Sequence, residues 1–144
     1  MKFKFSLEPV LKVRKHQEKL QQQKLAEEQM RKKEIDRLKN EIRGKLENFI
    51  KLSEENGMEK LHDFKIKSRH LEQAQELVAR LEKKSSKAGD QVDMERQKLA
   101  TVHKHKHILE KLKEIEKNLF TQKRERSEQK KLDEIAAQNF GRTS

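Results

Sequence analysis

Apolar residues recur at heptad spacing along the second half of the chain. The twelve a and d positions of this pattern, nine of them apolar, are Leu71, Ala74, Val78, Leu81, Ser85, Ala88, Val92, Glu95, Leu99, Val102, Lys106 and Leu109. A narrow stripe with this period is typical of a coiled coil. After Leu109 we expect the stripe to slip by about one residue and to continue through Leu112, Ile115 and Leu119.

The first half of the chain predicts another long helix, at about residues 6–54. Ser6 can cap its start, Glu8 suits the positive helix end, and Pro9, the only proline, falls in the first turn. Its apolar positions are Leu7, Val10, Leu11, Leu20, Leu25, Ile35, Leu38, Ile42, Leu46, Phe49, Ile50 and Leu52. They are sparse in the Gln-rich stretch 17–33, which we expect to be the softest part.

Two segments compete to be the turn between these helices. We favour a turn at about 55–58, because Gly57 suits a helix end and Asn56 with Glu59 resembles a capping box. A second helix would then cover about 59–138. The alternative turn, at Lys83–Asp90, keeps heptad phase and is better explained as continuous helix. With the favoured turn, residue i faces roughly residue 114 − i.

These patterns predict an all-α fold: an antiparallel two-helix coiled coil with an overhanging C-terminal helix. Residues 1–144 would form a single elongated unit. Only 31% of residues are hydrophobic and 42% are charged, which is too few apolar side chains for an ordinary globular core. No stretch is apolar enough to cross a membrane or act as a signal peptide, so we expect a cytoplasmic protein.

Catalytic and metal-binding patterns are weak in this sequence. There is no cysteine, phosphate-binding loop or nucleophile elbow, and a two-helix coil offers no enclosed pocket, so we expect neither an enzyme nor a cofactor. His103 and His107, at i and i+4, share a helix face as paired metal ligands would. The lysines beside them repel a cation, so we expect no metal and a solvated histidine run.

The net charge of +11 favours acidic partners. Residues 1–16 and 117–131 are strongly basic, and the hairpin would bring both towards one end, away from the acidic stretch 53–63. The alternative is a basic coiled-coil scaffold or a nucleic-acid-associated protein. Stacking on bases, however, needs aromatic side chains, and this chain has only phenylalanine. A protein contact fits the composition better than nucleic acid does.

About 30 C-terminal residues would overhang the hairpin. This segment projects the apolar side chains Leu112, Ile115, Leu119, Phe120, Leu132, Ile135 and Phe140. An apolar ridge without an intramolecular partner usually marks a docking face. A frayed tail or self-association is the alternative explanation.

Both ends of the chain resemble the flagellar export protein family FliJ. The resemblance lies in Phe3–Arg14, with Glu18 and Leu25–Glu27, and in Glu128–Ala136 followed by Phe140. It implies a cytoplasmic component of the flagellar type III export apparatus, peripheral to the inner membrane at the flagellar base. Such a protein is a coiled coil similar to the central stalk of rotary ATPases.

The resemblance also implies partners. Family members bind the ring of the export ATPase FliI and promote its assembly, contact the export gate protein FlhA near the hairpin tip, and are associated with FliH and export chaperones. The ring-facing residues would be Leu7, Leu11, Arg14, Lys130, Lys131, Leu132, Asp133 and Ile135. The gate-binding residues would be Ile42, Phe49, Leu71 and Ala74.

Two features complicate the gate assignment. Lys45 stands where the family often has an aromatic residue. From periodicity alone, the four gate-binding residues are also explained as plain hairpin core, and both roles can hold in part because a two-helix coil leaves its core residues partly exposed.

Overall fold

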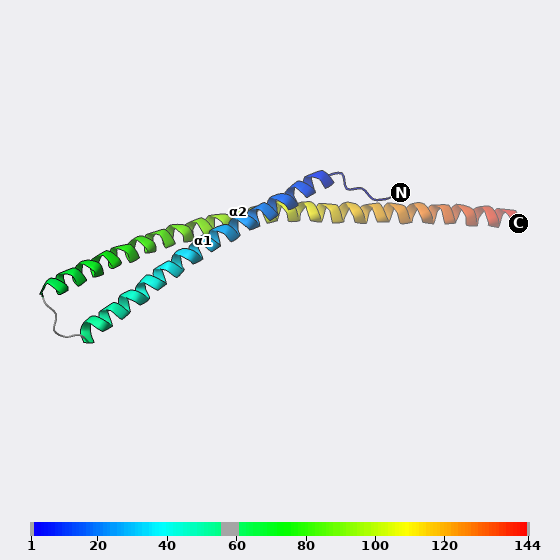
Figure 1. Cartoon of the computed structure of the whole chain (residues 1–144). Coiled ribbons are helices and arrows are strands. Elements are labelled where there is room, and N and C mark those ends of the chain that lie inside the picture. Colours follow the sequence, from blue (N-terminus) through cyan, green and yellow to red (C-terminus); the bar gives the residue numbers. More distant parts are fainter. Residues whose placement is uncertain (1, 56–60, 144) are drawn as a thin grey trace. The chain divides into compact units, whose positions relative to one another are not determined.

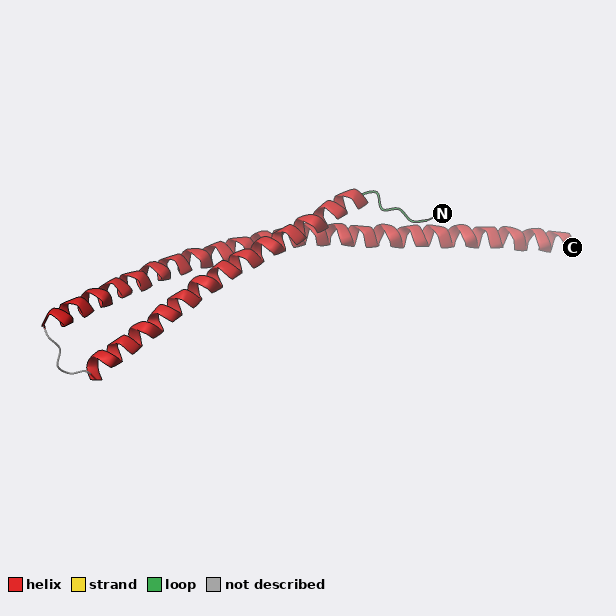
Figure 2. Cartoon of the chain, in the orientation of Figure 1, coloured by secondary structure: helices red, strands yellow, loops and turns green. Residues whose placement is uncertain are grey.

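Two long helices make up almost all of the described chain. The computed structural model describes residues 2–55 and 61–143, with side chains up to residue 141. Helix α1 is Glu8–Glu55 and helix α2 is Leu61–Thr143, and no strand occurs in these ranges (Figures 1 and 2). The predicted all-α two-helix fold is confirmed.

The helix ends lie within a few residues of those predicted. The favoured turn at about 55–58, with Asn56, Gly57 and Glu59, falls almost entirely outside the described residues. The alternative turn at Lys83–Asp90 is wrong, because that segment lies inside α2. Helix α2 also continues five residues beyond the predicted end at 138.

The chain divides into two compact units, and both helices contribute to each. Unit 1 is Met1–Lys19 with Ala100–Ser144, and unit 2 is Leu20–Leu99. In unit 1, Glu8 pairs with Lys113 and Glu18 pairs with Lys106, both at 2.9 Å. Residues nearer the start of α1 therefore face residues nearer the end of α2, which is the antiparallel arrangement.

Helix α1 begins one residue later than Ser6 capping would require. The Leu7 carbonyl accepts the backbone N–H of Leu11 at 2.9 Å, so Leu7 occupies the cap position and Ser6 precedes it. Pro9 lies in the first turn, as expected. The segment before the helix lies against α2, since Phe5 is buried and the Phe3 and Phe120 rings lie 5.7 Å apart.

Every one of the twelve heptad positions predicted in α2 is buried or half-buried. Helix α1 presents a matching series, also spaced by three and four residues: Leu11, Arg14, Glu18, Gln21, Leu25, Glu28, Lys32, Ile35, Lys39, Ile42, Leu46, Phe49 and Ser53. We call these two series the seam. Leu11 is its most buried member, only 1% exposed.

The three polar exceptions in the α2 half of the seam each have a partner on α1. Ser85 donates a hydrogen bond to Asp36 at 2.5 Å. Lys106 forms its ion pair with Glu18, and the Gln21 side-chain amide donates to the Glu95 carboxylate. Buried polar groups are costly without partners, so these contacts remove most of that cost.

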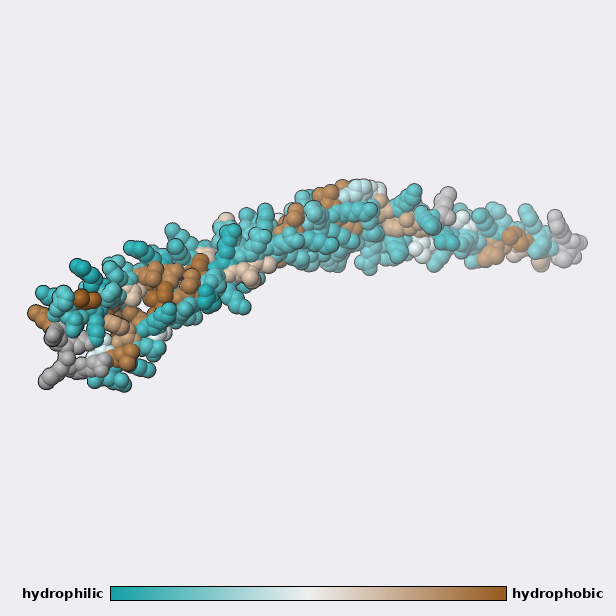
Figure 3. All heavy atoms as spheres, viewed as in Figure 1, coloured by the Kyte–Doolittle hydropathy of each residue, from teal (hydrophilic) through white to brown (hydrophobic). Residues whose placement is uncertain are grey.

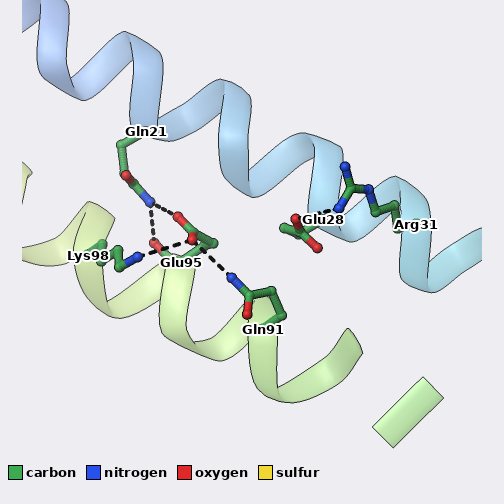
Figure 4. Close-up of polar contacts among 6 residues, drawn as sticks. All are labelled: Gln21, Glu28, Arg31, Gln91, Glu95 and Lys98. Carbon is green, nitrogen blue, oxygen red and sulfur yellow. Dashed lines mark hydrogen bonds and ion pairs between the residues drawn. The ribbon is translucent and has the colours of Figure 1, made fainter. Parts of the chain in front are cut away.

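The Gln21–Glu95 contact is the most enclosed of the three (Figure 4). The Gln21 amide also donates to the Glu95 backbone carbonyl at 3.1 Å, and Gln91 and Lys98 donate to the same carboxylate at 3.2 and 3.4 Å. Gln21 and Glu95 are 8% and 5% exposed. The Gln-rich stretch is thus closely packed through polar contacts, which its lack of apolar residues did not suggest.

The predicted slip of the stripe after Leu109 is wrong. Ile115 and Leu119 are 56% and 52% exposed, whereas Lys113, Glu116 and Phe120 are half-buried and keep the heptad phase. The phase persists because Lys113 pairs with Glu8 and Phe120 packs on Phe3. Long charged side chains can occupy seam positions when an opposite charge faces them.

The helices of unit 2 pair in a different register from 114 − i. That rule places Asp36 against residue 78, but Asp36 accepts its hydrogen bond from Ser85. It places Lys32 against residue 82, but the Lys32 side chain lies beside Gly89. A Cβ atom built on Gly89 would be 3.7 Å from the Cε of Lys32. The offset is seven residues, or about two helical turns, for these two contacts. It is two residues for Gln21–Glu95, since the rule places Gln21 against residue 93. The polar pairs, which the apolar pattern ignored, account for it.

Leu11→Ala should destabilise the protein by about 2–4 kcal/mol, because it empties the most buried apolar site of the seam. Urea unfolding followed by circular dichroism measures this change. The matched control is Val13→Ala, whose side chain is 54% exposed and whose expected effect is below about 0.5 kcal/mol. Equal effects of the two substitutions would contradict the assigned seam.

Acid should weaken the helix pairing. The hydrogen bond from Lys106 lowers the pKa of Glu18, that from Lys113 lowers the pKa of Glu8, and that from Gln21 lowers the pKa of Glu95, each from an ordinary value of 4.5. The stability that these ionised carboxylates give the folded protein is fully present above their ordinary pKa of 4.5. It is lost as the pH falls through their lower pKa values in the folded protein. The melting temperature should therefore drop as the pH is lowered from about 5 to about 3.

The variant Glu18→Gln with Glu95→Gln tests the origin of that drop. It should melt lower than the wild type at neutral pH but lose less on acidification, because two of the titrating groups are gone. Glu114→Gln, at an exposed position, serves as the control and should behave like the wild type. An unchanged acid response in the double variant would assign the drop to other groups.

Candidate partner-binding surfaces

An apolar groove lies between the helices of unit 2 near their connection. Its inner part, about 240 Å³, is lined by Ile42, Lys45, Leu46, Phe49, His70, Leu71 and Ala74. A similar outer part is lined by Phe49, Ile50, Ser53, Glu54, Phe64, Lys67, Ser68 and Leu71. We call the two together the tip groove. Figure 3 shows the hydrophobic side chains gathered there.

All four predicted gate-binding residues line the inner part of the tip groove. Ile42, Phe49, Leu71 and Ala74 are half-buried seam residues, so they belong to the hairpin core and also border an opening. Their placement in the hairpin core is confirmed, and their role in binding the gate stays a prediction. An open apolar groove between two helices can accept apolar side chains of another protein.

Lys45 makes one rim of the groove polar. Its ammonium lies 3.7 Å from Glu41 one turn away, and its side chain is 77% exposed. At this rim the groove therefore offers a long, mobile, charged side chain where an aromatic ring would give a flat apolar contact.

Phe64 belongs to the groove, although it was not among the predicted site residues. Its side chain is 59% exposed and lines the outer part with Phe49. The sequence did signal it, because the predicted register paired Phe49 with Phe64. Leu61, the first residue of α2, is 71% exposed and does not line the groove.

The C-terminal part of α2 is exposed along its whole length from Thr121 to Gly141. We call these residues the overhang. Leu132 and Ile135, three residues apart and therefore neighbours on one face, are 61% and 54% exposed, and Phe140 is 78% exposed. Figure 3 shows this hydrophobic patch. The overhang is shorter than the predicted 30 residues, because Phe120 packs on Phe3 and Leu112 is half-buried.

Charged side chains accompany the apolar residues of the overhang. Lys130 and Lys131 immediately precede Leu132, and both are exposed. Asp133 accepts a hydrogen bond from Gln129 at 3.1 Å. The overhang therefore combines a short apolar strip with charged residues of both signs, Lys130 and Lys131 before Leu132 and Asp133 and Glu134 after it.

The predicted ring-facing residues of α1 differ in accessibility. Leu7 is 36% exposed, Arg14 is half-buried and donates a hydrogen bond to Gln17 at 3.2 Å, and Leu11 is enclosed in the seam. Leu11 could influence a partner only by holding the two helices together. The accessible members of the predicted set are therefore mainly those of the overhang.

The histidine run forms contacts within unit 1. The His103 and His107 rings stack with centroids 6.3 Å apart. His103 Nδ1 lies 3.3 Å from Glu18, and His107 Nδ1 lies 4.0 Å from Glu110. Over residues 2–55 and 61–143, no group of three or more His, Asp or Glu side chains is arranged to hold a metal ion. The same ranges contain no helix apolar and long enough to cross a membrane.

Comparison with known proteins identifies the family. No curated protein and no solved structure matches the chain significantly. The model of the family described as Flagellar FliJ protein matches residues 3–144, which is nearly the whole chain. Members of this family are non-catalytic components of the flagellar export apparatus. The extent of the match shows that this chain belongs to the FliJ family.

Proposed function

We propose that this protein is a stalk-like adaptor of the flagellar type III export apparatus, working in the cytoplasm at the inner-membrane base of the flagellum. One surface, formed by the overhang and the accessible start of α1, binds the ring of the export ATPase FliI and promotes its assembly. The other, the tip groove, contacts the export gate protein FlhA. Contacts with FliH and export chaperones belong to the same proposal.

The overhang is the observation that best supports ring binding. A soluble helix that leaves Leu132 and Ile135 exposed over an uncovered stretch of about 20 residues gains little stability from them within the chain. A partner that covers them would gain the free energy of burying apolar surface. Lys130 and Lys131 before this strip, and Asp133 and Glu134 within it, can pair with opposite charges on a partner.

The tip groove supports gate binding independently. It lies in unit 2, whereas the overhang lies in unit 1, so the protein has separate surfaces for two partners. Each surface combines exposed apolar side chains with charged side chains beside them. An adaptor between an ATPase ring and an export gate needs two such separate surfaces.

Leu132→Asp with Ile135→Asp should weaken binding to the export ATPase by about tenfold or more, because two apolar contacts are replaced by charges that cannot be buried cheaply. The helix content should be unchanged, since both side chains are exposed. The measurement is stimulation of ATP hydrolysis by the cognate ATPase as the protein is titrated.

The matched control is Leu20→Asp with Met30→Asp. These side chains are 45% and 70% exposed, lie in α1 outside the overhang, and change the net charge equally. The control should stimulate the ATPase as the wild type does. If the overhang variant also did so, the ring-binding assignment would be rejected.

Phe64→Ala should weaken binding to the cytoplasmic part of the export gate protein by about tenfold, since it removes an exposed aromatic side chain from the groove. Leu61→Ala is the control, because Leu61 is as exposed but lies outside the groove lining. Binding measured by calorimetry should separate the two variants. Equal loss in both, or none in either, argues against the groove as the gate site.

A further inference from the structure

A third apolar surface lies on one side of unit 1, apart from the seam and the overhang. In α2 it consists of Ile108, Leu112, Ile115 and Leu119, of which Ile108, Ile115 and Leu119 are 55%, 56% and 52% exposed and Leu112 is half-buried. In heptad terms these residues alternate between positions c and g, beside the seam. We call them the side ridge. The ridge extends for about 17 Å along the helix.

Helix α1 adds two valines to the same side. Counting from Leu11 as position a, Val10 is a g residue and Val13 is a c residue, and they are 41% and 54% exposed. In an antiparallel pair the g positions of the two helices flank the same side of the seam. The Glu8–Lys113 pair fixes how the two helices are aligned along their axes. With this alignment the valines lie alongside Ile108 and Leu112.

The spacing of the side ridge matches a helix as its occupant. Ile108 and Ile115 are seven residues apart, as are Leu112 and Leu119, so the ridge repeats with the period of a coiled-coil seam. An apolar stripe with this period packs best against another helix whose own stripe has the same period. A third helix would then lie against both α1 and α2.

The charges around the side ridge indicate which kind of helix fits. From residue 105 to residue 126 the c and g positions contain no acidic residue, and the same holds for residues 6–17 of α1. Lys104 and Lys111 lie four residues before Ile108 and Ile115, so they border the ridge. Arg126 continues its line seven residues beyond Leu119.

These bordering bases are available for a partner. Within the described part of the chain, no carboxylate lies within 4.0 Å of Lys104, Lys111 or Arg126. By contrast, the seam lysines Lys106 and Lys113 are paired with Glu18 and Glu8. On its side away from the seam the ridge thus has a basic border, and no ion pair among the described residues neutralises these bases. On the seam side Glu116 lies beside Leu112 and Leu119.

We propose that the side ridge docks an acidic amphipathic helix of a partner protein, which completes a three-helix coiled coil in unit 1. The inference goes beyond the ATPase and gate contacts proposed above, because the α2 residues of the side ridge belong to neither the overhang nor the tip groove. It shares with the proposed ring surface only the start of α1, where Val10 and Val13 lie. A second copy of this chain is a poorer occupant, since each copy carries a net charge of +11 and would bring the same basic border.

A pair of synthetic peptides tests this proposal on the full-length protein. Each peptide is a helix of about three heptads with leucine at a and d. One has glutamate at every flanking position, and its twin has lysine there. Fluorescence anisotropy at physiological salt should show the glutamate peptide binding at least about tenfold more tightly than the lysine twin.

Two variants locate the binding on the side ridge. Ile115→Ser with Leu119→Ser removes exposed apolar contacts and should abolish most of the binding while leaving the helix content unchanged. Lys104→Glu with Lys111→Glu keeps the apolar ridge and should reverse the preference between the twins. Leu20→Ser with Met30→Ser, at exposed sites in unit 2, should bind as the wild type does.

Several outcomes would overturn the proposal. Equal binding of the two peptides would remove the role of charge, and full binding by the Ile115→Ser, Leu119→Ser variant would place the contact elsewhere. Sedimentation of the wild type as a dimer that this variant abolishes would assign the ridge to a second copy. None of these outcomes affects the ATPase assay on the overhang, so the two proposals fail separately.

Discussion

The structure depends on a seam in which polar residues of one helix meet polar partners on the other. A two-helix coil has too little apolar surface to choose a register by hydrophobic contact alone, because sliding one helix by a heptad brings similar apolar residues together again. Polar pairs do not allow such a slide, because each polar group needs one particular partner. The pairs are Ser85–Asp36, Glu95–Gln21 and Lys106–Glu18. A slide would leave each of these polar groups buried without its partner.

This constraint also explains where the protein can bind others. The polar pairs join the two helices along their middle, where a recess of about 320 Å³ lined in part by Lys32, Gly89 and Val92 also lies beside the seam. Near the helix connection the seam loosens into the tip groove, and beyond Phe120 it ends and leaves the overhang uncovered. Apolar residues that the heptad phase excludes from the seam, such as Ile115, form the side ridge. The overhang and the tip groove are places where the seam ends or opens, and the side ridge lies beside it.

The sequence predicted the two-helix fold and the α2 half of the seam correctly, because heptad periodicity depends only on helix geometry. It failed on the register of the two helices and on the heptad phase of α2 after Leu109. Both depend on charged residues, which a search for apolar stripes leaves out. Lys113 was discarded although it pairs with Glu8. The four residues predicted to bind the gate line a groove that the sequence did not predict, and Phe64 was not among them, since periodicity does not show how far a side chain is exposed.

The register is tested most directly by engineered disulfides, because the chain has no cysteine of its own. Asp36→Cys with Ser85→Cys places cysteines at two facing positions whose side-chain oxygens now lie 2.5 Å apart, so this pair should crosslink more readily than the next on mild oxidation. Asp36→Cys with Val78→Cys tests the pairing that apolar matching alone would give, and it should remain reduced. Efficient closure of the second pair, with the first remaining reduced, would contradict a register set by polar partners.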